Sequence, residues 1–320
     1  KDQILVMGHK LSDIDSVGAA IGIYRAAKTL NKKAYIVIDN PTSSIIPLMN
    51  TFSDNQDYEA DMFVNNHEAK EIMDDNTLLV VVDTNKPSIT QCEDLLYMAK
   101  MIVVLDHHRQ GSDTIRNSVL SYIEPYASSA SEMVAEILQY FTEGIRIRNV
   151  EADSIYAGIM IDTDNFMQKT GVRTFEAAAF LRRCGADVTR VRKLFREDMN
   201  DYKARGETIR NAELFRGQFA ISECPSDYVD SPTVVGAQAA NELLNIVGVK
   251  ASFVLTEYKG VIYISARAID EVNVQIIMER MGGGGHLNIA GCQLENTSVE
   301  EGIIVLKRTL DKMIEEGEIS

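Results

Sequence analysis

Histidine and aspartate residues recur in four short segments of the chain, and their spacing suits metal binding. These residues are His9, Asp13 and Asp15 in the first segment, Asp83 in the second, Asp106, His107 and His108 (followed by Arg109) in the third, and Asp162 and Asp164 in the fourth. Imidazole and carboxylate ligands together favour Mn, Fe or Zn over Ca or Cu. The pattern therefore predicts a divalent metal site, and spacing alone does not choose between Asp162 and Asp164.

Three of the four segments directly follow apolar runs that predict buried β-strands. The runs are residues 3–8 (QILVMG), residues 77–83 (TLLVVVD) and residues 101–106 (MIVVLD). Runs that are apolar on both faces and alternate with helical stretches indicate a parallel sheet covered on both sides. Ligands bind at the carboxyl ends of such strands, so we expect the segments to meet there. A loop histidine or a helix-capping aspartate would explain any one segment, but not their shared position.

The chain divides into three parts by pattern. Residues 1–190 predict a doubly wound, mainly parallel α/β domain, with a further strand at 34–38 and helices at 14–30, 129–141, 151–161 and 174–183. Residues 191–215 are mostly charged with few helix breakers, which predicts a helical connector. Residues 216–320 predict a smaller α+β domain, with strands at 219–222, 251–258 and 261–268 and helices at 234–246, 273–281 and 298–314. Lys259-Gly260 is a hairpin signal.

Composition excludes several classes of protein. The chain has 320 residues, 45% of them hydrophobic, and a net charge of -15, which suits a soluble globular protein but not a broad basic surface for long nucleic acid. A small phosphate remains possible because metal ions reverse the local field. No apolar run approaches the ~20 residues that span a bilayer. Four scattered cysteines predict reduced thiols in the cytosol. His67, which follows no apolar strand, is expected to be a solvated surface residue.

Taken together, the motifs resemble those of the DHH phosphoesterase superfamily. The run at residues 106–108 matches the Asp-His-His motif that names the superfamily, and the first segment matches its His-x-x-x-Asp-x-Asp motif. Asp83 and Asp162 match two further motifs, and residues 282–286 (GGGGH) resemble the signature of the DHH-associated domain. Within the superfamily the chain is most similar to the GdpP-type cyclic-di-AMP phosphodiesterases of Gram-positive bacteria, through residues 7–10, 265–267 and 273–279.

The resemblance implies hydrolysis of cyclic-di-AMP to linear pApA by water that two divalent metal ions activate, with manganese the expected metal. One ion would be held by His9, Asp13 and Asp83, and the other by Asp15, Asp83, His107 and Asp162. Asp106 would support the site, with His108 and Arg109 facing the phosphate. The expected substrate-binding residues are Arg267, Gly283, Gly284, Gly285 and His286. Four ligand carboxylates offset two divalent ions, so the phosphate needs direct metal coordination or positive charge from Arg109 or Arg267.

Two alternatives stay open from the sequence. One is an exonuclease of the same superfamily that acts on linear dinucleotides or short oligonucleotides, as nanoRNase does; a pyrophosphatase is disfavoured by the glycine-rich run. The other is a non-catalytic nucleotide-binding sensor, which a degraded ligand set would mark, whereas the set here is complete. The chain begins with Lys1, and a strand-like run starts by Gln3. Together with this start, the resemblance implies the cytoplasmic module of a longer protein, anchored in the membrane by an N-terminal part outside this sequence. It also implies a homodimer.

Overall fold

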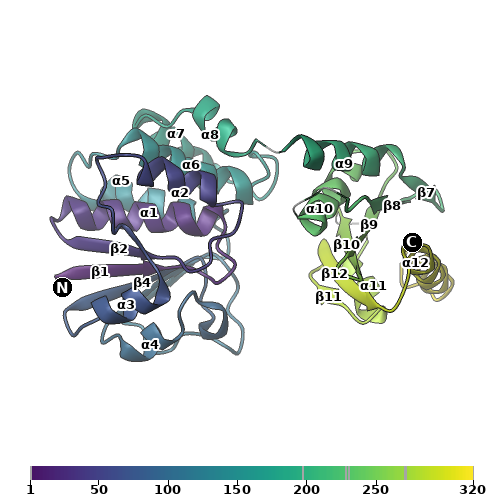
Figure 1. The fold of residues 1–320 in the computed structure, drawn as a ribbon, viewed down its shortest axis with the longest axis horizontal. Coiled ribbons are helices and arrows are strands. Elements are labelled where there is room, and N and C mark those ends of the chain that lie inside the picture. Colours follow the sequence, from purple (N-terminus) through teal and green to yellow (C-terminus); the bar gives the residue numbers. More distant parts are fainter. Residues whose placement is uncertain (1, 197, 228, 230, 270–271, 320) are drawn as a thin grey trace. The chain divides into compact units, whose positions relative to one another are not determined.

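The chain folds into two compact units, Lys1–Arg196 and Glu197–Ser320, in a computed structural model that describes residues 2–196, 198–227, 229, 231–269 and 272–319. The first unit is coloured purple to teal and the second green to yellow in Figure 1. Among the described residues, each cluster of buried hydrophobic side chains belongs to one unit only. Each unit therefore has its own hydrophobic core.

A parallel sheet of six strands forms the centre of the first unit. The strands are β1 (Gln3–Met7), β2 (Lys33–Val37), β3 (Phe63–Val64), β4 (Thr77–Val82), β5 (Ile102–Asp106) and β6 (Leu120–Ile123), and their order in the sheet is β3-β2-β1-β4-β5-β6. Alternate side chains enter the cores on opposite faces, with Val6 and Val80 on one and Leu5 and Leu79 on the other. The predicted doubly wound α/β fold is confirmed.

Helices cover both faces of this sheet (Figure 1). One face carries α1 (Ile14–Thr29), α2 (Ile46–Ser53), α5 (Ala130–Phe141), α6 (Asn149–Asp162), α7 (Val172–Arg183) and α8 (Val188–Leu194). The other face carries α3 (Asn66–Ile72) and α4 (Asp94–Met98), and a short 3-10 helix, η1 (Pro87–Ile89), precedes α4. His67 lies exposed on α3, as predicted, and all four cysteines are free.

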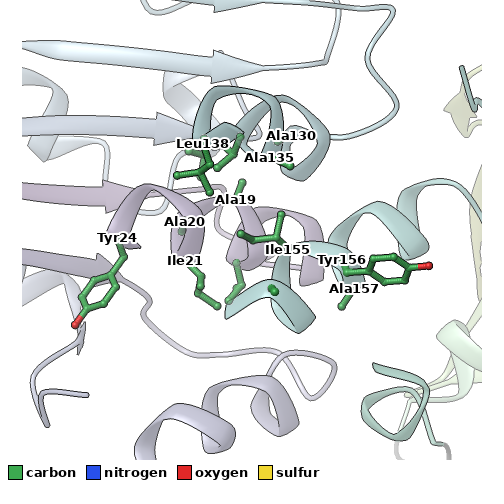
Figure 2. Close-up of a cluster of buried hydrophobic side chains, with 14 of the residues drawn as sticks. Ala19, Ala20, Ile21, Tyr24, Ala130, Ala135, Leu138, Ile155, Tyr156 and Ala157 are labelled. Atoms are coloured by element: carbon green, nitrogen blue, oxygen red, sulfur yellow. The ribbon is translucent and has the colours of Figure 1, made fainter. Parts of the chain in front are cut away.

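Small side chains let α1, α5 and α6 pack closely in the core of the first unit. Figure 2 shows Ala19 and Ile21 of α1, Leu138 of α5 and Ile155 of α6 in one buried cluster. A Cβ atom added to Gly158 of α6 would lie 2.1 Å from Ser131 Oγ of α5, so only glycine fits this contact without displacement. This packing fixes both the start of α1 and the end of α6 relative to the sheet.

The second unit has a mixed sheet of six strands. The strands are β7 (Glu213–Phe215), β8 (Phe219–Cys224), β9 (Ala251–Tyr258), β10 (Val261–Ala268), β11 (Gly284–Gly285) and β12 (Ile289–Glu295), in the order β11-β12-β10-β9-β8-β7. Among the described strands of this second sheet, only β8 and β9 pair in parallel. The helices are α9 (Met199–Arg210), α10 (Pro232–Leu243), α11 (Val274–Arg280) and α12 (Val299–Glu315). The predicted α+β class is confirmed, including the β9–β10 hairpin.

The connector segment differs in detail from the sequence prediction. Residues 191–215 hold the end of α8, the whole of α9 and the short strand β7 in place of one continuous helix. The division between the units falls after Arg196, and Ala204 of α9 is buried in a core cluster of the second unit. Across the described residues, no helix combines the length and the apolar character needed to cross a membrane.

Candidate metal centre

The candidate residues share one position, the carboxyl edge of the first sheet. His9 lies two residues after β1, Asp83 directly follows β4, and His107 directly follows β5. The strand order reverses between β1 and β4, which is the switch point where open α/β sheets bind ligands. Asp13 and Asp15 at the start of α1 and Asp162 at the end of α6 reach the same edge.

Asp83 lies at the centre of the cluster. Its Oδ2 atom is 3.3 Å from His9 Nε2, and its Oδ1 atom is 3.3 Å from His107 Nε2. Its side chain is only 2% exposed. Its backbone φ of 59° lies in the left-handed region, which aspartate enters more readily than most residues other than glycine. The chain thus turns sharply after β4 while the carboxylate stays between two imidazoles.

The remaining predicted ligands form two groups that flank Asp83, and His108, whose Nδ1 atom is 3.7 Å from Asp83 Oδ1, forms a third group with Asp83 and His107. In the first group, His9 Nε2 is 3.6 Å from Asp13 Oδ2. In the second group, His107 Nε2 is 3.9 Å from Asp15 Oδ2 and 3.3 Å from Asp162 Oδ2. The structure therefore brings all six predicted metal ligands together. Asp164, the alternative to Asp162, is exposed and accepts a hydrogen bond from Gln168 instead.

The first turn of α5 holds the carboxylate of Asp15. Asp15 is fully buried, and its two oxygens accept hydrogen bonds from the backbone N–H groups of Ala130 (2.7 Å) and Ser131 (2.8 Å). The first N–H groups of a helix have no partner within the helix and favour negative charge. Asp15 is therefore fixed by a helix more than a hundred residues away in the sequence.

Burial and crowding shift the pKa values of these groups. Burial would lower the pKa of both histidines, but their carboxylate neighbours raise the pKa of His9 to about 10 and that of His107 to about 9. Burial, together with the charge of Asp83, raises the pKa of Asp162 to about 7. Burial and the charge of Asp162 raise the pKa of Asp15 well above its ordinary value. Without a cation, the cluster therefore holds extra protons at neutral pH.

The donor atoms of the cluster fit divalent cations. Asp83 Oδ1 and His107 Nε2 are buried and have no hydrogen-bond partner among the described residues. A buried polar atom without a partner costs about 1–3 kcal/mol, and a bound cation would remove that cost. Mixed imidazole and carboxylate donors suit Mn, Fe or Zn. The cluster is therefore a candidate site for divalent metal ions, and Asp83 lies 3.3 Å from a histidine of each of the two predicted groups.

Asp106 and His108 form a hydrogen-bonded pair beside this cluster. Asp106 is fully buried, and its Oδ1 atom accepts from the backbone N–H of His108 (3.1 Å) and lies 2.8 Å from His108 Nδ1. His108 and Arg109 are themselves exposed. The buried side chain of Asn85 contacts Asp106 from the other side (2.5 Å). Sequence reasoning missed Asn85, because an amide two residues after Asp83 gives no sign of its distant partner.

Arg267 and His286, predicted to bind substrate, lie in the second unit. Arg267 is on β10, where its Nη1 atom donates to the carbonyl of Ala266 (2.9 Å) and its Nε atom is buried without a partner in the described part of the chain. Burial lowers the pKa of Arg267. No ion pair of Arg267 with an acidic residue is present among the described residues. His286 is exposed just after β11.

The glycine-rich run has a structural explanation in the second unit. The backbone N–H of Gly283 donates to the carbonyl of Met278 (2.8 Å) and so helps to end α11. A Cβ atom on Gly283 would lie 2.2 Å from Gly291 O, and one on Gly285 would lie 2.5 Å from Ala290 Cα. Close packing against β12 therefore requires glycine at both positions. Substrate binding by Gly283, Gly284 and Gly285 stays a prediction.

Comparisons with known proteins agree with the two-unit division. Residues 3–159 match the DHH family, N-terminal domain, and residues 219–316 match the DHHA1 domain. A relative named cyclic-di-AMP phosphodiesterase GdpP, from Bacillus subtilis, is 43% identical over 320 residues that cover 98% of this chain and 48% of that protein. Cyclic-di-AMP phosphodiesterase PdeA from Listeria monocytogenes is 39% identical over 303 residues, covering 94% of this chain and 46% of that protein.

The chain spans about half the length of these curated relatives. Among solved structures, an exopolyphosphatase-related protein from Bacteroides fragilis matches with a TM-score of 0.80 over 98% of this chain and 92% of that chain. Its sequence is only 20% identical, so it supports the fold and not a substrate. Both domain matches and the identity to the two relatives lead to one conclusion: the chain belongs to the DHH family and carries a DHHA1 domain.

Proposed function

We propose that the chain is a phosphodiesterase that hydrolyses cyclic-di-AMP to linear pApA. The observation that carries this proposal is the complete histidine and aspartate cluster around Asp83 at the switch point of the first sheet. The substrate is inferred from the two relatives named as cyclic-di-AMP phosphodiesterases, whose identity extends through both units. Because those relatives are about twice as long, the proposal concerns the activity of this segment.

Two divalent ions, with manganese the expected metal, would occupy the cluster. His9, Asp13 and Asp83 would hold one ion, and Asp15, Asp83, His107 and Asp162 the other. When bound, such ions supply Lewis-acid polarisation of phosphoryl oxygens and an activated water. The four carboxylates offset the charge of two divalent ions, so the phosphate must coordinate a metal directly or meet other cationic groups. The exposed His108 and Arg109 at the same edge are the candidates in the first unit.

Asp106 prepares His108 for this role. Because Asp106 Oδ1 lies 2.8 Å from His108 Nδ1, that nitrogen carries a proton directed at the carboxylate. The Nε2 atom of His108 is left to contact a phosphate or to hold a proton for the leaving oxygen. Asp106 acts on this chemistry through His108, since it is itself fully buried.

The second unit would contribute to substrate binding. The half-buried guanidinium of Arg267 has only a backbone carbonyl as partner among the described residues, and a phosphate would supply the negative charge that it lacks. His286 is exposed and could hydrogen-bond a phosphate or stack on a base. Gly283, Gly284 and Gly285 would present backbone N–H groups close to the ligand.

A cytoplasmic position within a longer, membrane-anchored protein and pairing into a homodimer are also part of the proposal. The length of the two relatives, about twice the matched segment, is compatible with further segments in such a protein. Sedimentation of the purified chain would test the dimer. No long nucleic acid is expected as a partner, because the net charge is -15.

The test is turnover of cyclic-di-AMP by the purified chain with Mn²⁺, followed by product chromatography, beside the same assay in EDTA. We expect pApA to accumulate only with metal. Linear dinucleotides and pyrophosphate assayed in parallel separate the alternatives. Faster cleavage of linear dinucleotides than of cyclic-di-AMP would favour the exonuclease, and tight binding of cyclic-di-AMP without turnover would favour the sensor. Either result would overturn the proposed activity.

A further inference from the structure

Asn85 is a buried amide that joins two motifs of the candidate site. It is 2% exposed and lies two residues after Asp83. Its Nδ2 atom donates to Asp106 Oδ2 (2.5 Å) and lies 3.3 Å from the carbonyl oxygen of His108. Its own backbone carbonyl accepts from the N–H of Ile115, which fixes the loop that carries it. One side chain therefore contacts both the carboxylate and the histidine of the pair described above.

The contacts of Asp106 show what Asn85 can control. One carboxylate oxygen of Asp106 faces His108, and the other faces Asn85. A carboxylate held at both oxygens cannot rotate about its bond to Cβ. The ring of His108 is more than half exposed, and its shortest contacts are the backbone and Nδ1 contacts to Asp106. Its Nδ1 atom also lies 3.7 Å from Asp83 Oδ1, and its ring centroid lies 4.3 Å from that of His107. Loss of the contact at Oδ2 would therefore loosen the orientation of His108.

We propose that Asn85 is a positioning residue that fixes the Asp106 carboxylate and, through it, the orientation of the His108 ring toward the phosphate. The part of this proposal that concerns catalysis rests on the proposed phosphodiesterase function. The part that concerns the His108 ring rests on the geometry alone.

The chain offers a matched control in Asn66. Its Nδ2 atom also donates to a carboxylate oxygen, Asp39 Oδ2 (3.4 Å), and to a backbone carbonyl, that of Gln91 (3.2 Å). Its Oδ1 atom, like that of Asn85, is buried without a partner among the described residues. Asn66 makes no contact with His108 or Asp106 in its hydrogen bonds. The same substitution at the two positions therefore separates a local effect on the pair from the general effect of losing a buried donor.

The experiment compares Asn85→Asp and Asn66→Asp in the full chain. Aspartate keeps the size of asparagine and removes the N–H donor, but it also places a second carboxyl group beside Asp106. Asn85→Leu, which removes the donor without adding charge, is therefore measured in parallel. With Mn²⁺ and cyclic-di-AMP, we expect Asn85→Asp to lower kcat by about 10–100-fold, the usual loss for a partner that orients a site residue. KM and the Mn²⁺ affinity from titration should stay within about threefold, because ground-state binding is retained. Asn66→Asp should keep kcat within about twofold of the unsubstituted chain.

A second readout needs no activity. In the metal-free protein, the hydrogen-bonded Nδ1 proton of His108 should give a downfield NMR signal, identified by its loss in His108→Gln. We expect Asn85→Asp to shift or broaden this signal and Asn66→Asp to leave it unchanged. An unchanged signal together with wild-type kcat in Asn85→Asp would overturn the proposal. If cyclic-di-AMP is not turned over at all, the NMR comparison still decides the role of Asn85. Asn85→Ala replaces Asn85→Asp if that variant does not fold.

Discussion

Asp83 combines an unusual backbone conformation with a central position among the candidate ligands. A left-handed φ at a residue other than glycine costs about 1–3 kcal/mol and persists where the surrounding structure imposes it, often at functional sites. Here the strands β1 and β5 on either side of β4 fix the chain up to Val82, and the turn follows at once. The strain therefore accompanies the placement of one carboxylate within reach of two histidines.

Asp162→Asn tests whether the fourth segment supplies a metal ligand. The amide keeps the size of the carboxylate but removes its charge, so the group with Asp15 and His107 loses an anionic donor. We expect activity with Mn²⁺ to fall by more than about 100-fold, beyond the usual effect of outer partners of a metal site. Isothermal titration with Mn²⁺ should show weaker binding of at least one ion.

Asp164→Asn is the control for that substitution. Asp164 is exposed, and its φ of 46° is one that asparagine tolerates as well as aspartate does. The activity and Mn²⁺ binding of the Asp164→Asn variant should match those of the unsubstituted chain. Equal losses in the two variants would contradict the assignment of Asp162 to the cluster.

The metal-free protein should lose stability as pH rises. Folding raises the pKa of His9 to about 10 and of His107 to about 9 from 6.5, so the stability they contribute is complete below pH 6.5 and disappears as pH rises through 9–10. Folding also raises the pKa of Asp162 from 3.8 to about 7, so its contribution to stability is lost as pH rises between these two values. Asp83, whose pKa is lowered, acts only below pH 3.8, outside this range.

Thermal melts from pH 6 to pH 10 in EDTA and in Mn²⁺ provide the measurement. We expect Tm to fall steadily in EDTA and to change less with Mn²⁺, because the cation replaces the protons in the cluster. A His9→Asn variant should show a weaker fall in EDTA. A constant or rising Tm in EDTA between pH 6.5 and pH 9 would show that the histidines are not held in their charged form.

At the level of elements, the parallel sheet explains why the site could be predicted from sequence. Strands apolar on both faces that alternate with helices are typical of a covered parallel sheet, and the carboxyl ends of parallel strands share an edge. The residues that follow β1, β4 and β5 were therefore predictable neighbours without knowledge of the order of the strands. The cluster is completed by residues at the start of α1 and the end of α6. The positions of these helix ends depend on packing between helices, which the spacing of residues in the sequence predicts only approximately.

Other features could not be predicted because long-range contacts determine them. Ala130 and Ser131 hold Asp15 only because α5 packs beside α1. Strands β3 and β6 are short, and β6 lies at an edge with exposed residues, so neither shows a clear apolar pattern. The glycine-rich run was expected to serve a ligand, and its pairing with β12 appeared only in the structure.

The contact between α1 and α6 should be sensitive to a single methyl group. A Cβ atom on Gly18 of α1 would lie 2.7 Å from the backbone carbonyl of Ser154 in α6 and 2.8 Å from Ser131 Oγ. Because backbone cannot move aside cheaply, Gly18→Ala should lower the free energy of unfolding of the first unit by about 1–3 kcal/mol. It should also weaken Mn²⁺ binding, because Asp15 begins the same helix.

Gly206→Ala in α9 is the matched control in the second unit. A Cβ atom there meets nothing within 4 Å, and the residue is exposed within a helix. Alanine should stabilise the second unit by about 0.5–1 kcal/mol. Hydrogen exchange resolved along the chain measures both effects. We expect hydrogen exchange in α1 and α6 to become faster in Gly18→Ala and to stay unchanged in Gly206→Ala. Equal exchange rates in the two variants would refute the packing argument.

At the scale of the whole molecule, the candidate metal ligands and the candidate substrate residues belong to different units. The first unit contains the entire ligand cluster, and the second contains Arg267 and His286. The separate hydrophobic cores mean that a substitution in the second unit should leave the metal cluster intact. Metal binding and substrate binding can therefore be disturbed independently.

Arg267→Gln should show this independence. Removing a guanidinium that pairs with a phosphate forfeits about 1.5–3 kcal/mol for a charged hydrogen bond, which corresponds to a KM for cyclic-di-AMP raised by roughly 10–100-fold. The Mn²⁺ affinity should not change, because no ligand is altered. Because the Nε atom of Arg267 is buried, circular dichroism must show that the variant is folded.

Arg216→Gln is the comparison that isolates substrate binding from the loss of positive charge. Arg216 lies in the same unit, is 58% exposed and already pairs with Asp311 (2.8 Å), so a phosphate gains little from it. Its loss should change KM by less than about twofold, as is usual for an exposed ion pair. If both variants raise KM equally, the effect is one of net charge. If only Arg267→Gln raises KM while Mn²⁺ binding persists, the guanidinium of Arg267 is part of the substrate site.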